Sequence, residues 1–180
     1  MLMNAARSVL LIVDVQERLL PAMAAPDRVV AGCGTLIDGA ARLGVPVIAS
    51  EQYPKGLGPT VAALKGRLRP EAIFAKLSFS CAGDPNLLAG LDATGRPDVI
   101  VAGIEAHICV LQTALDLAAR GVKVRVVADA VGARRPEAVD LALDRLGRAG
   151  IGLVNVEMVL FEWLGRAGTD DFKYLSSLIK

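Results

Sequence analysis

The apolar residues of this chain follow two patterns, which take turns along the sequence. Short apolar runs rich in β-branched residues predict buried strands, and they cover residues 9–13, 45–49, 72–75, 98–102, 122–128 and 152–156. Between them the apolar residues recur at helical spacing, which predicts helices over residues 26–43, 60–64, 85–91, a stretch ending at Arg120, a stretch from Pro136 to a stop at Gly150, and residues 157–164 and 169–180.

This alternation predicts an α/β fold of three layers, α/β/α, with a mostly parallel six-stranded sheet of Rossmann-like type. Parallel neighbours need crossover connections, and those crossovers place helices on both faces of the sheet. No repeat or linker divides the chain, so we expect residues 1–180 to form a single domain. A chain of this length buries roughly 70% of the surface that its unfolded form exposes, which is enough for a core without disulfides.

Ligands bind at the carboxyl edge of such sheets. The residues that the pattern assigns to this edge are Asp14, Glu51, Lys76, Asp129 and the turn before Cys109. An acid, a cation and a thiol from separate strands therefore converge there, which favours a catalytic site.

Cys109 follows an apolar strand that Gly103 is expected to end, and it opens a helix. The first turn of a helix favours thiolate over thiol. Asp14 is a candidate base, and Lys76 a candidate cation that lowers the pKa of the thiol. The alternative is an ordinary ion pair between Asp14 and Lys76 beside an inert buried thiol.

Composition narrows the class of protein. The formal net charge is +1, with no basic run longer than Arg134-Arg135, so we expect no nucleic-acid partner. No stretch reaches the ~20 apolar residues of a membrane helix. Three scattered cysteines, Cys33, Cys81 and Cys109, argue against a disulfide framework and favour a cytoplasmic protein.

A late helix carries Phe161, Trp163 and Leu164 with no remaining strand to cover. Together with an apolar share of 53%, this predicts a homo-oligomer. Cys33 lies within a predicted helix and is expected in the core. Cys81 follows Lys76 closely, so it is either a buried small residue or a resolving thiol for Cys109.

Three motifs carry a family resemblance: DVQ at 14–16, KLSFS at 76–80 and GIEAHICVLQTALDL at 103–117. They resemble the isochorismatase-like cysteine hydrolases, which include nicotinamidases, N-carbamoyl amidohydrolases and isochorismatases. EQYPKGLGPT at 51–60 and the terminal FKYLSSLIK resemble the subgroup of isochorismatase domain-containing proteins.

The resemblance implies a catalytic triad of Asp14, Lys76 and Cys109. It also implies a cis peptide bond between Ile104 and Glu105, with the backbone N–H groups of Glu105 and Cys109 as the oxyanion hole. The presence of Cys109 argues against the vinyl-ether hydrolysis of isochorismatases that lack the cysteine.

Nicotinamidase-type members hold a divalent metal with one Asp and several His residues. Here the corresponding region reads Glu51-Gln52-Tyr53, and His107 is the only histidine. A single imidazole does not make a site of that kind. We therefore expect no metal and no cofactor.

Five residues are candidates for the substrate pocket: Gln16, Tyr53, Phe79, Glu105 and His107. Each of the first three either touches the substrate or only shapes a loop. Glu105 either selects an amide or cationic substrate or bonds to backbone. His107 either lines the pocket and relays protons or packs on a neighbouring loop.

The sequence thus predicts a metal-independent cysteine hydrolase that acts on a small amide-like or related C–N substrate through a Cys109 thioester. One alternative is a non-catalytic ligand-binding or scaffold protein of the same fold. Another is a redox sensor that uses Cys109 and Cys81.

Overall fold

The computed structural model describes residues 2–179 and contains one six-stranded sheet in the order β3-β2-β1-β4-β5-β6. All strand pairings are parallel, which confirms the predicted fold class. The strands are β1 (Ser8–Val13), β2 (Val47–Gln52), β3 (Ile73–Lys76), β4 (Asp98–Ile104), β5 (Lys123–Gly132) and β6 (Gly152–Val154).

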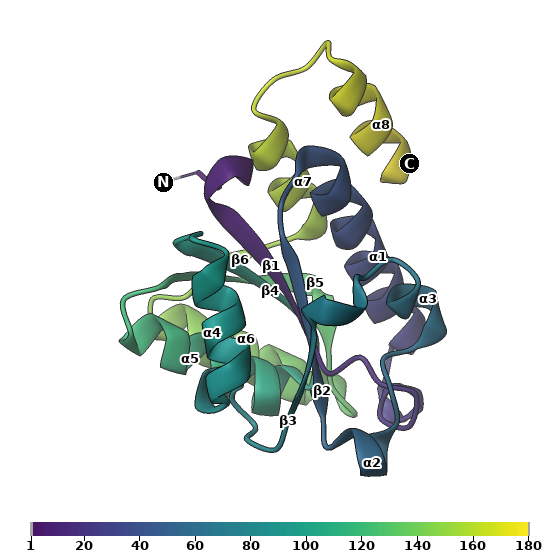
Figure 1. Cartoon of the computed structure of the whole chain (residues 1–180), viewed down its shortest axis with the longest axis vertical. Coiled ribbons are helices and arrows are strands. Elements are labelled where there is room, and N and C mark those ends of the chain that lie inside the picture. The colour runs from purple at the N-terminus through teal and green to yellow at the C-terminus, as the bar shows by residue number, and fades with distance from the viewer. Residues whose placement is uncertain (1, 180) are drawn as a thin grey trace.

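Helices cover both faces of this sheet (Figure 1). One face carries α1 (Pro26–Leu43), α3 (Ala62–Lys65), α7 (Val156–Leu164) and α8 (Asp170–Leu178). The other carries α4 (Pro85–Ala93), α5 (Leu111–Ala119) and α6 (Pro136–Arg148), while the short α2 (Pro54–Leu57) follows β2.

The alternation of side chains along β1 explains this three-layer arrangement. Leu10 and Ile12 pack into the cluster under α1, whereas Val9, Leu11 and Val13 pack into the cluster under α4, α5 and α6. Because both faces of the strand are buried, its sequence is continuously apolar rather than alternating.

Several boundaries differ from the prediction at the carboxyl ends of strands. β2 continues to Gln52 because it pairs with β3 as far as Lys76. β4 continues through Gly103, which therefore lies inside the strand and does not end it. Gly103 has a φ of 115°, and a side chain there would collide with the carbonyl oxygen of Val13. The glycine thus permits a close approach of two backbones.

The prediction that Asp129 lies at the carboxyl edge was wrong. β5 extends to Gly132, so Asp129 lies within the strand. Its Oδ1 accepts a hydrogen bond of 2.9 Å from the backbone N–H of Val156, at the start of α7. Asp129 therefore holds a helix start and takes no part in the site.

The late helix is better covered than the prediction of a homo-oligomer assumed. Trp163 is buried and donates from Nε1 to Ser8 Oγ over 3.0 Å. Leu164 packs against the same core, and the ring of Phe161 lies 6.2 Å from that of Phe172 in α8. Trp163 and Leu164 are therefore covered within the chain, whereas Phe161 remains 38% exposed. Among residues 2–179, no helix is both long and apolar enough to cross a membrane.

Candidate active site

Asp14 and Lys76 meet at the carboxyl edge as a fully buried ion pair. Lys76 Nζ lies 2.8 Å from Asp14 Oδ2, and neither side chain is exposed to solvent. The same ammonium donates to Gln52 Oε1 at 2.7 Å and lies 3.1–3.2 Å from the carbonyl oxygens of Ser78 and Phe79. Surrounding acceptors thus replace the water that a buried cation loses.

Ser50 belongs to this site, although the sequence analysis did not identify it. Its hydroxyl donates to Asp14 Oδ1 over 2.7 Å, and its carbonyl accepts from the backbone N–H of Asp14. Cys81 Sγ in turn lies 3.5 Å from Ser50 Oγ. The only signal in the sequence was its position, since Ser50 directly follows the predicted strand 45–49, while its place opposite Val13 is set by the strand pairing.

Cys109 lies in a single π-helical turn, Ala106–Val110, before α5 begins. The N–H groups of Ile108 and Val110 both donate to the carbonyl of Glu105, the second across five residues. The peptide bond between Ile104 and Glu105 is cis, at the position that the resemblance implied. The cysteine therefore lies within a π turn rather than opening a regular α-helix, and π turns often occur at functional sites.

The electrostatics of Cys109 differ from the expectation that its pKa is lowered. Burial and the charge of Asp14 raise the pKa of Cys109 to about 12, whereas Lys76 lowers it by less. Asp14 also raises the pKa of this thiol as a hydrogen-bond acceptor, which further favours the protonated form. In the resting site the sulfur is thus a protonated thiol, and a thiolate arises only when that proton is transferred.

The other two cysteines are buried, as expected for Cys33. Burial raises the pKa of Cys33 to about 12 and also raises the pKa of Cys81. A thiol that stays protonated oxidises slowly. These surroundings disfavour a redox role for Cys81.

Glu105 forms an ion pair with a side chain that the sequence analysis did not assign to the site. Arg134 Nε lies 2.9 Å from Glu105 Oε2, and the two side chains are 59% and 7% exposed. The carboxylate therefore bonds to an arginine from the loop after β5 rather than to backbone. The only sequence signal was the pair Arg134-Arg135.

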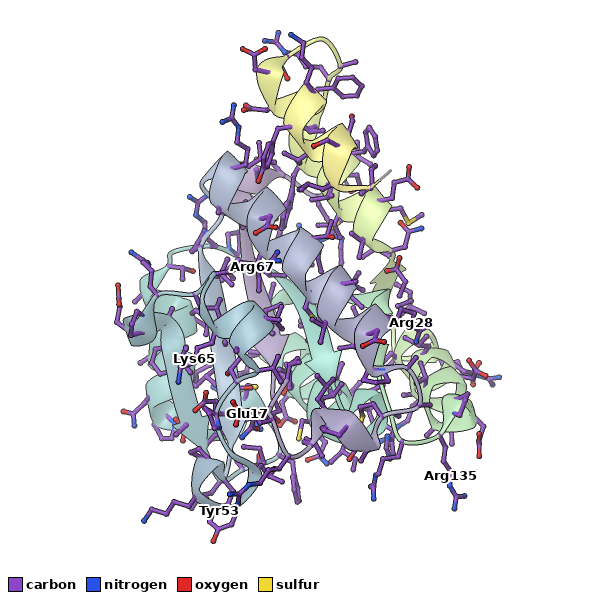
Figure 2. All side chains as sticks on the ribbon, turned by 90° about the vertical axis from the view of Figure 1, so that its right-hand side faces the viewer. Glu17, Arg28, Tyr53, Lys65, Arg67 and Arg135 are labelled. Atoms are coloured by element: carbon purple, nitrogen blue, oxygen red, sulfur yellow. The ribbon has the colours of Figure 1, made fainter. Side chains whose placement is uncertain are left out.

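The remaining candidates occupy different surroundings. Gln16 is buried and bonded to the chain across the edge, since its Nε2 donates to the carbonyls of Gln52 and Gly58, and its Oε1 accepts from Gln52 N–H. Tyr53 and Phe79 are 52% and 55% exposed, and Figure 2 shows Tyr53 at the bottom of the molecule, opposite the C-terminal helix. His107 is half-buried, and its Nδ1 is buried without a partner among residues 2–179.

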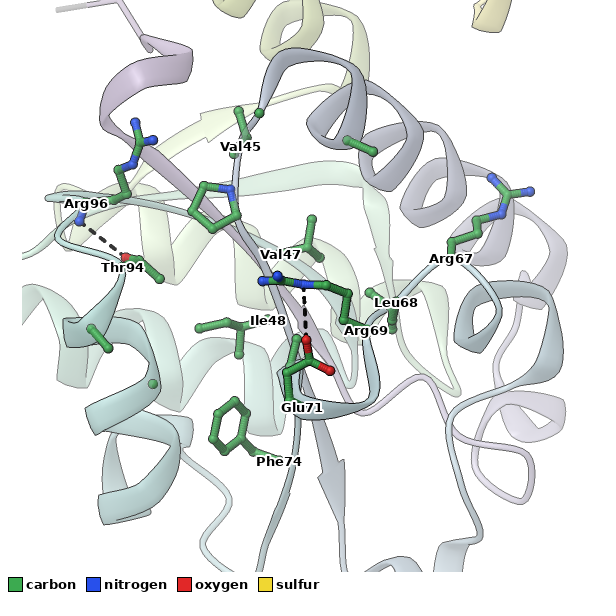
Figure 3. A pocket seen from close by; sticks show the side chains of 16 residues that line it. Val45, Val47, Ile48, Arg67, Leu68, Arg69, Glu71, Phe74, Thr94 and Arg96 are labelled. Carbon is green, nitrogen blue, oxygen red and sulfur yellow. Dashed lines mark hydrogen bonds and ion pairs between the residues drawn. The ribbon is translucent and has the colours of Figure 1, made fainter.

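Two cavities lie on β3, one at each end. A cavity of about 300 Å³ borders Lys76 and is also lined by Pro54, Ser78 and Asp84. A larger one of about 730 Å³ lies at the amino end of β2 and β3, where Val47, Ile48 and Phe74 form its floor (Figure 3). The larger cavity contains no residue of the candidate triad, so its size does not make it the reaction site.

The donor set does not fit the divalent metal of nicotinamidase-type proteins. In the part of the chain that the structure describes, no three His, Cys, Asp or Glu side chains are grouped as metal ligands. Gln52 lies at the end of β2, and its Oε1 accepts from Lys76. We therefore derive no step through a metal ion.

Known proteins share this fold and these motifs. The isochorismatase domain model matches residues 8–158, and the chain belongs to that family. Isochorismatase domain-containing protein 1 of Danio rerio is 38% identical over 179 residues, which cover 99% of this chain and 62% of that protein. The present chain thus spans less than two thirds of that relative's length.

Solved structures agree with the fold. MAR1 ribonuclease from Caenorhabditis elegans has a TM-score of 0.92 and 37% identity, covering 99% of this chain and 92% of its own. The YcaC gene product of Escherichia coli, described as an octameric hydrolase of unknown specificity, has a TM-score of 0.92 and 26% identity, with coverages of 98% and 90%. An isochorismatase-like hydrolase fold is therefore established for this chain.

Proposed function

We propose that this protein is a metal-independent cysteine hydrolase that acts on a small amide-like or related C–N substrate. The observation that carries the proposal is the buried ion pair of Asp14 and Lys76, both of which act on the pKa of the Cys109 thiol. A base, its counter-ion and a nucleophile are the parts that thioester chemistry needs. We take residues 1–180 as one hydrolase domain, because both hydrophobic clusters pack on the same sheet.

In the first half of the reaction, the sulfur of Cys109 attacks the substrate carbonyl while its proton moves to Asp14. The backbone N–H groups of Glu105 and Cys109 are assigned to the oxyanion of the tetrahedral intermediate. Asp14 then gives the proton to the leaving nitrogen, and the C–N bond breaks to leave a thioester.

In the second half, water attacks the thioester and Asp14 accepts its proton. The C–S bond breaks, the acid product leaves, and the thiol of Cys109 regains its proton. Lys76 balances the charge of Asp14 whenever that carboxylate is ionised, because the two side chains are buried against each other.

The direct test is a panel of amides, carbamoyl compounds and esters assayed with wild type and Cys109→Ala under identical conditions. The proposal predicts that at least one C–N substrate is hydrolysed and that the variant loses at least 10³-fold in kcat/KM, in line with the loss of a covalent nucleophile. Equal hydrolysis by the variant would exclude Cys109 as the nucleophile.

A second candidate is a non-catalytic member of the fold that binds a ligand or partner. Its support is that Cys109 is only 5% exposed and that its pKa is raised to about 12. If iodoacetamide labels Cys109 no faster than the fully buried Cys33, this candidate is favoured. An acyl adduct on Cys109 would exclude it.

RNA is a further possible substrate for this protein. The similar Caenorhabditis elegans protein is named a ribonuclease, so an RNA substrate belongs in the same panel. We propose that RNA is not cleaved, because the net charge of +1 provides no basic footprint.

For the compartment we propose the cytoplasm, because three scattered cysteines do not suit a disulfide framework.

A further inference from the structure

The groups around Cys109 follow the order of strands along the carboxyl edge. Lys76 ends β3, Asp14 follows β1, the cysteine turn follows β4, and Arg134 follows β5. Neighbouring strands lie about 4.8 Å apart. Arg134 is therefore one strand away from the turn of Cys109, on the side opposite Asp14 and Lys76.

One contact fixes Arg134 and leaves most of its donors unused. Its Nε lies 2.9 Å from Oε2 of the buried Glu105, while the arginine side chain is 59% exposed. A guanidinium has five N–H donors in a planar fork that matches a carboxylate. Among residues 2–179, no acceptor contacts its two terminal nitrogens. Glu105 thus holds the guanidinium at the cysteine turn with its terminal fork available.

The surroundings of Arg134 add positive potential at this point. Arg28 Nη2 donates to the carbonyl of Val131 at the end of β5. The 13-residue helix α6 begins just after Arg134, and no side chain caps its N-terminus. Glu137 is the one acidic residue in its first turn. The N-terminal end of a helix favours anions.

We propose that Arg134 binds a carboxylate of the substrate, so that the site takes C–N substrates with an acidic group on the acyl side. This inference rests on the proposed attack by Cys109. A substrate whose carbonyl lies at the sulfur can reach Arg134 with a chain of a few atoms, because one strand spacing separates the two. Neutral amides lack this contact and bind more weakly.

Alkylation of Cys109 tests this without a known substrate. Iodoacetate and iodoacetamide attack the same sulfur, each forming an S–C bond and releasing iodide, but only iodoacetate carries a carboxylate. The measurement is the ratio of the two rate constants at Cys109, located by peptide mapping at low ionic strength and divided by the same ratio for a free thiol. Altered exposure of Cys109 changes both rates together and leaves the ratio unchanged.

The expected ratio in wild type exceeds one and falls about five- to tenfold in Arg134→Gln. Arg135→Gln is the matched control, because Arg135 is the adjacent exposed arginine and extends into solvent (Figure 2). Its ratio stays at the wild-type value. Arg134→Lys keeps the charge without the fork, and its ratio lies between those of wild type and Arg134→Gln.

An unchanged ratio in Arg134→Gln overturns the inference. An equal fall in both glutamine variants also overturns it, because it would show that the iodoacetate carboxylate responds only to the overall positive charge of this surface. In either case the proposed hydrolase stands. If neither reagent alkylates Cys109 in wild type, Cys109 is not a usable nucleophile, and the proposed function falls together with the inference.

Discussion

At the scale of single residues, the site depends on the donors that hold the carboxylate of Asp14. Ser50 donates to Oδ1 and Lys76 to Oδ2, and the charge of Asp14 in turn raises the pKa of Cys109. A carboxylate without exposure to water needs such partners. Removing one donor therefore affects both folding stability and the position of the base.

Lys76→Met leaves the charge of Asp14 buried without its counter-ion. We expect the free energy of unfolding to fall by about 3–5 kcal/mol, the usual cost of breaking a buried pair by removing one partner. Urea denaturation measures it. The control is Lys173→Met, whose lysine is 74% exposed in a pair with Asp170 and contributes less than about 1 kcal/mol. Equal losses in the two variants would contradict the account.

Alkylation of Cys109 is expected to depend on pH in an unusual way. Burial and Asp14 raise its pKa from an ordinary value near 9 to about 12. Only the thiolate reacts, so the rate with iodoacetamide should rise about tenfold per pH unit beyond pH 9, without a plateau there. Cys109→Ala supplies the background from Cys33 and Cys81. A plateau of the rate between pH 7 and 9 would show that the surroundings of Cys109 do not raise its pKa.

The same shift affects stability. Below pH 9 the thiol is protonated in both the folded and the unfolded chain. Between pH 9 and 12 the thiol loses its proton in the unfolded chain but keeps it in the folded chain. Cys109 therefore lowers the free energy of unfolding progressively as the pH rises through this range.

At the scale of elements, the path of the chain between β1 and β4 positions the cysteine turn. Gly103 lies against the backbone of Val13, the residue before Asp14. Its φ of 115° lies in a region open to glycine. This close approach brings the end of β4 beside Asp14, and the π turn then directs Cys109 to that carboxylate.

Gly103→Ala should therefore destabilise the protein by at least 3 kcal/mol or prevent soluble expression, because a β-carbon meets the carbonyl of Val13. Gly95→Ala is the matched control. Gly95 also has a positive φ, 64°, but nothing lies within 4 Å of an added β-carbon, so only about 1 kcal/mol is expected. Thermal unfolding of both variants measures the difference; similar melting temperatures would contradict this role of Gly103.

Apolar runs predicted the element types well, and α1 has the predicted bounds, since Pro26 and Gly44 carry strong start and stop signals. Strand ends were less predictable. β4 and β5 continue because they pair with each other, and pairing between distant segments is not visible in a local pattern. For that reason Asp129 was misplaced.

The residues of the candidate site also differ in how well the sequence predicted them. The motifs pointed to Asp14, Lys76 and Cys109, and the structure brings all three together. Ser50 and Arg134 were missed, because their parts depend on side-chain contacts across neighbouring strands. The direction of the pKa shift of Cys109 was also wrong, since the depth of burial could not be judged from a helix start alone.

At the scale of the whole molecule, exposed apolar side chains gather in the loops beside Lys76. Tyr53, Leu77 and Phe79 are 52%, 75% and 55% exposed. These loops follow β2 and β3 at the carboxyl edge. Because exposed apolar side chains favour association, we expect a second copy to cover these loops, in place of the contact around Trp163 that the sequence suggested.

Light scattering during size-exclusion chromatography tests this at micromolar concentration. Wild type should have at least twice the 18.8 kDa mass of the chain, and Leu77→Ser with Phe79→Ser should shift it toward the monomer. Leu141→Ser is the control, since Leu141 is 69% exposed but lies on α6. A monomeric wild type would refute the expectation.

The most direct test of the central claim is the mass of the intact protein, quenched during turnover of the best substrate in the panel. The account predicts one acyl group per chain, mapped to the peptide that carries Cys109, with no adduct in Cys109→Ala. Turnover without an adduct on Cys109, or an adduct on Cys81 instead, would contradict the assignment of Cys109 as the nucleophile beside Asp14 and Lys76.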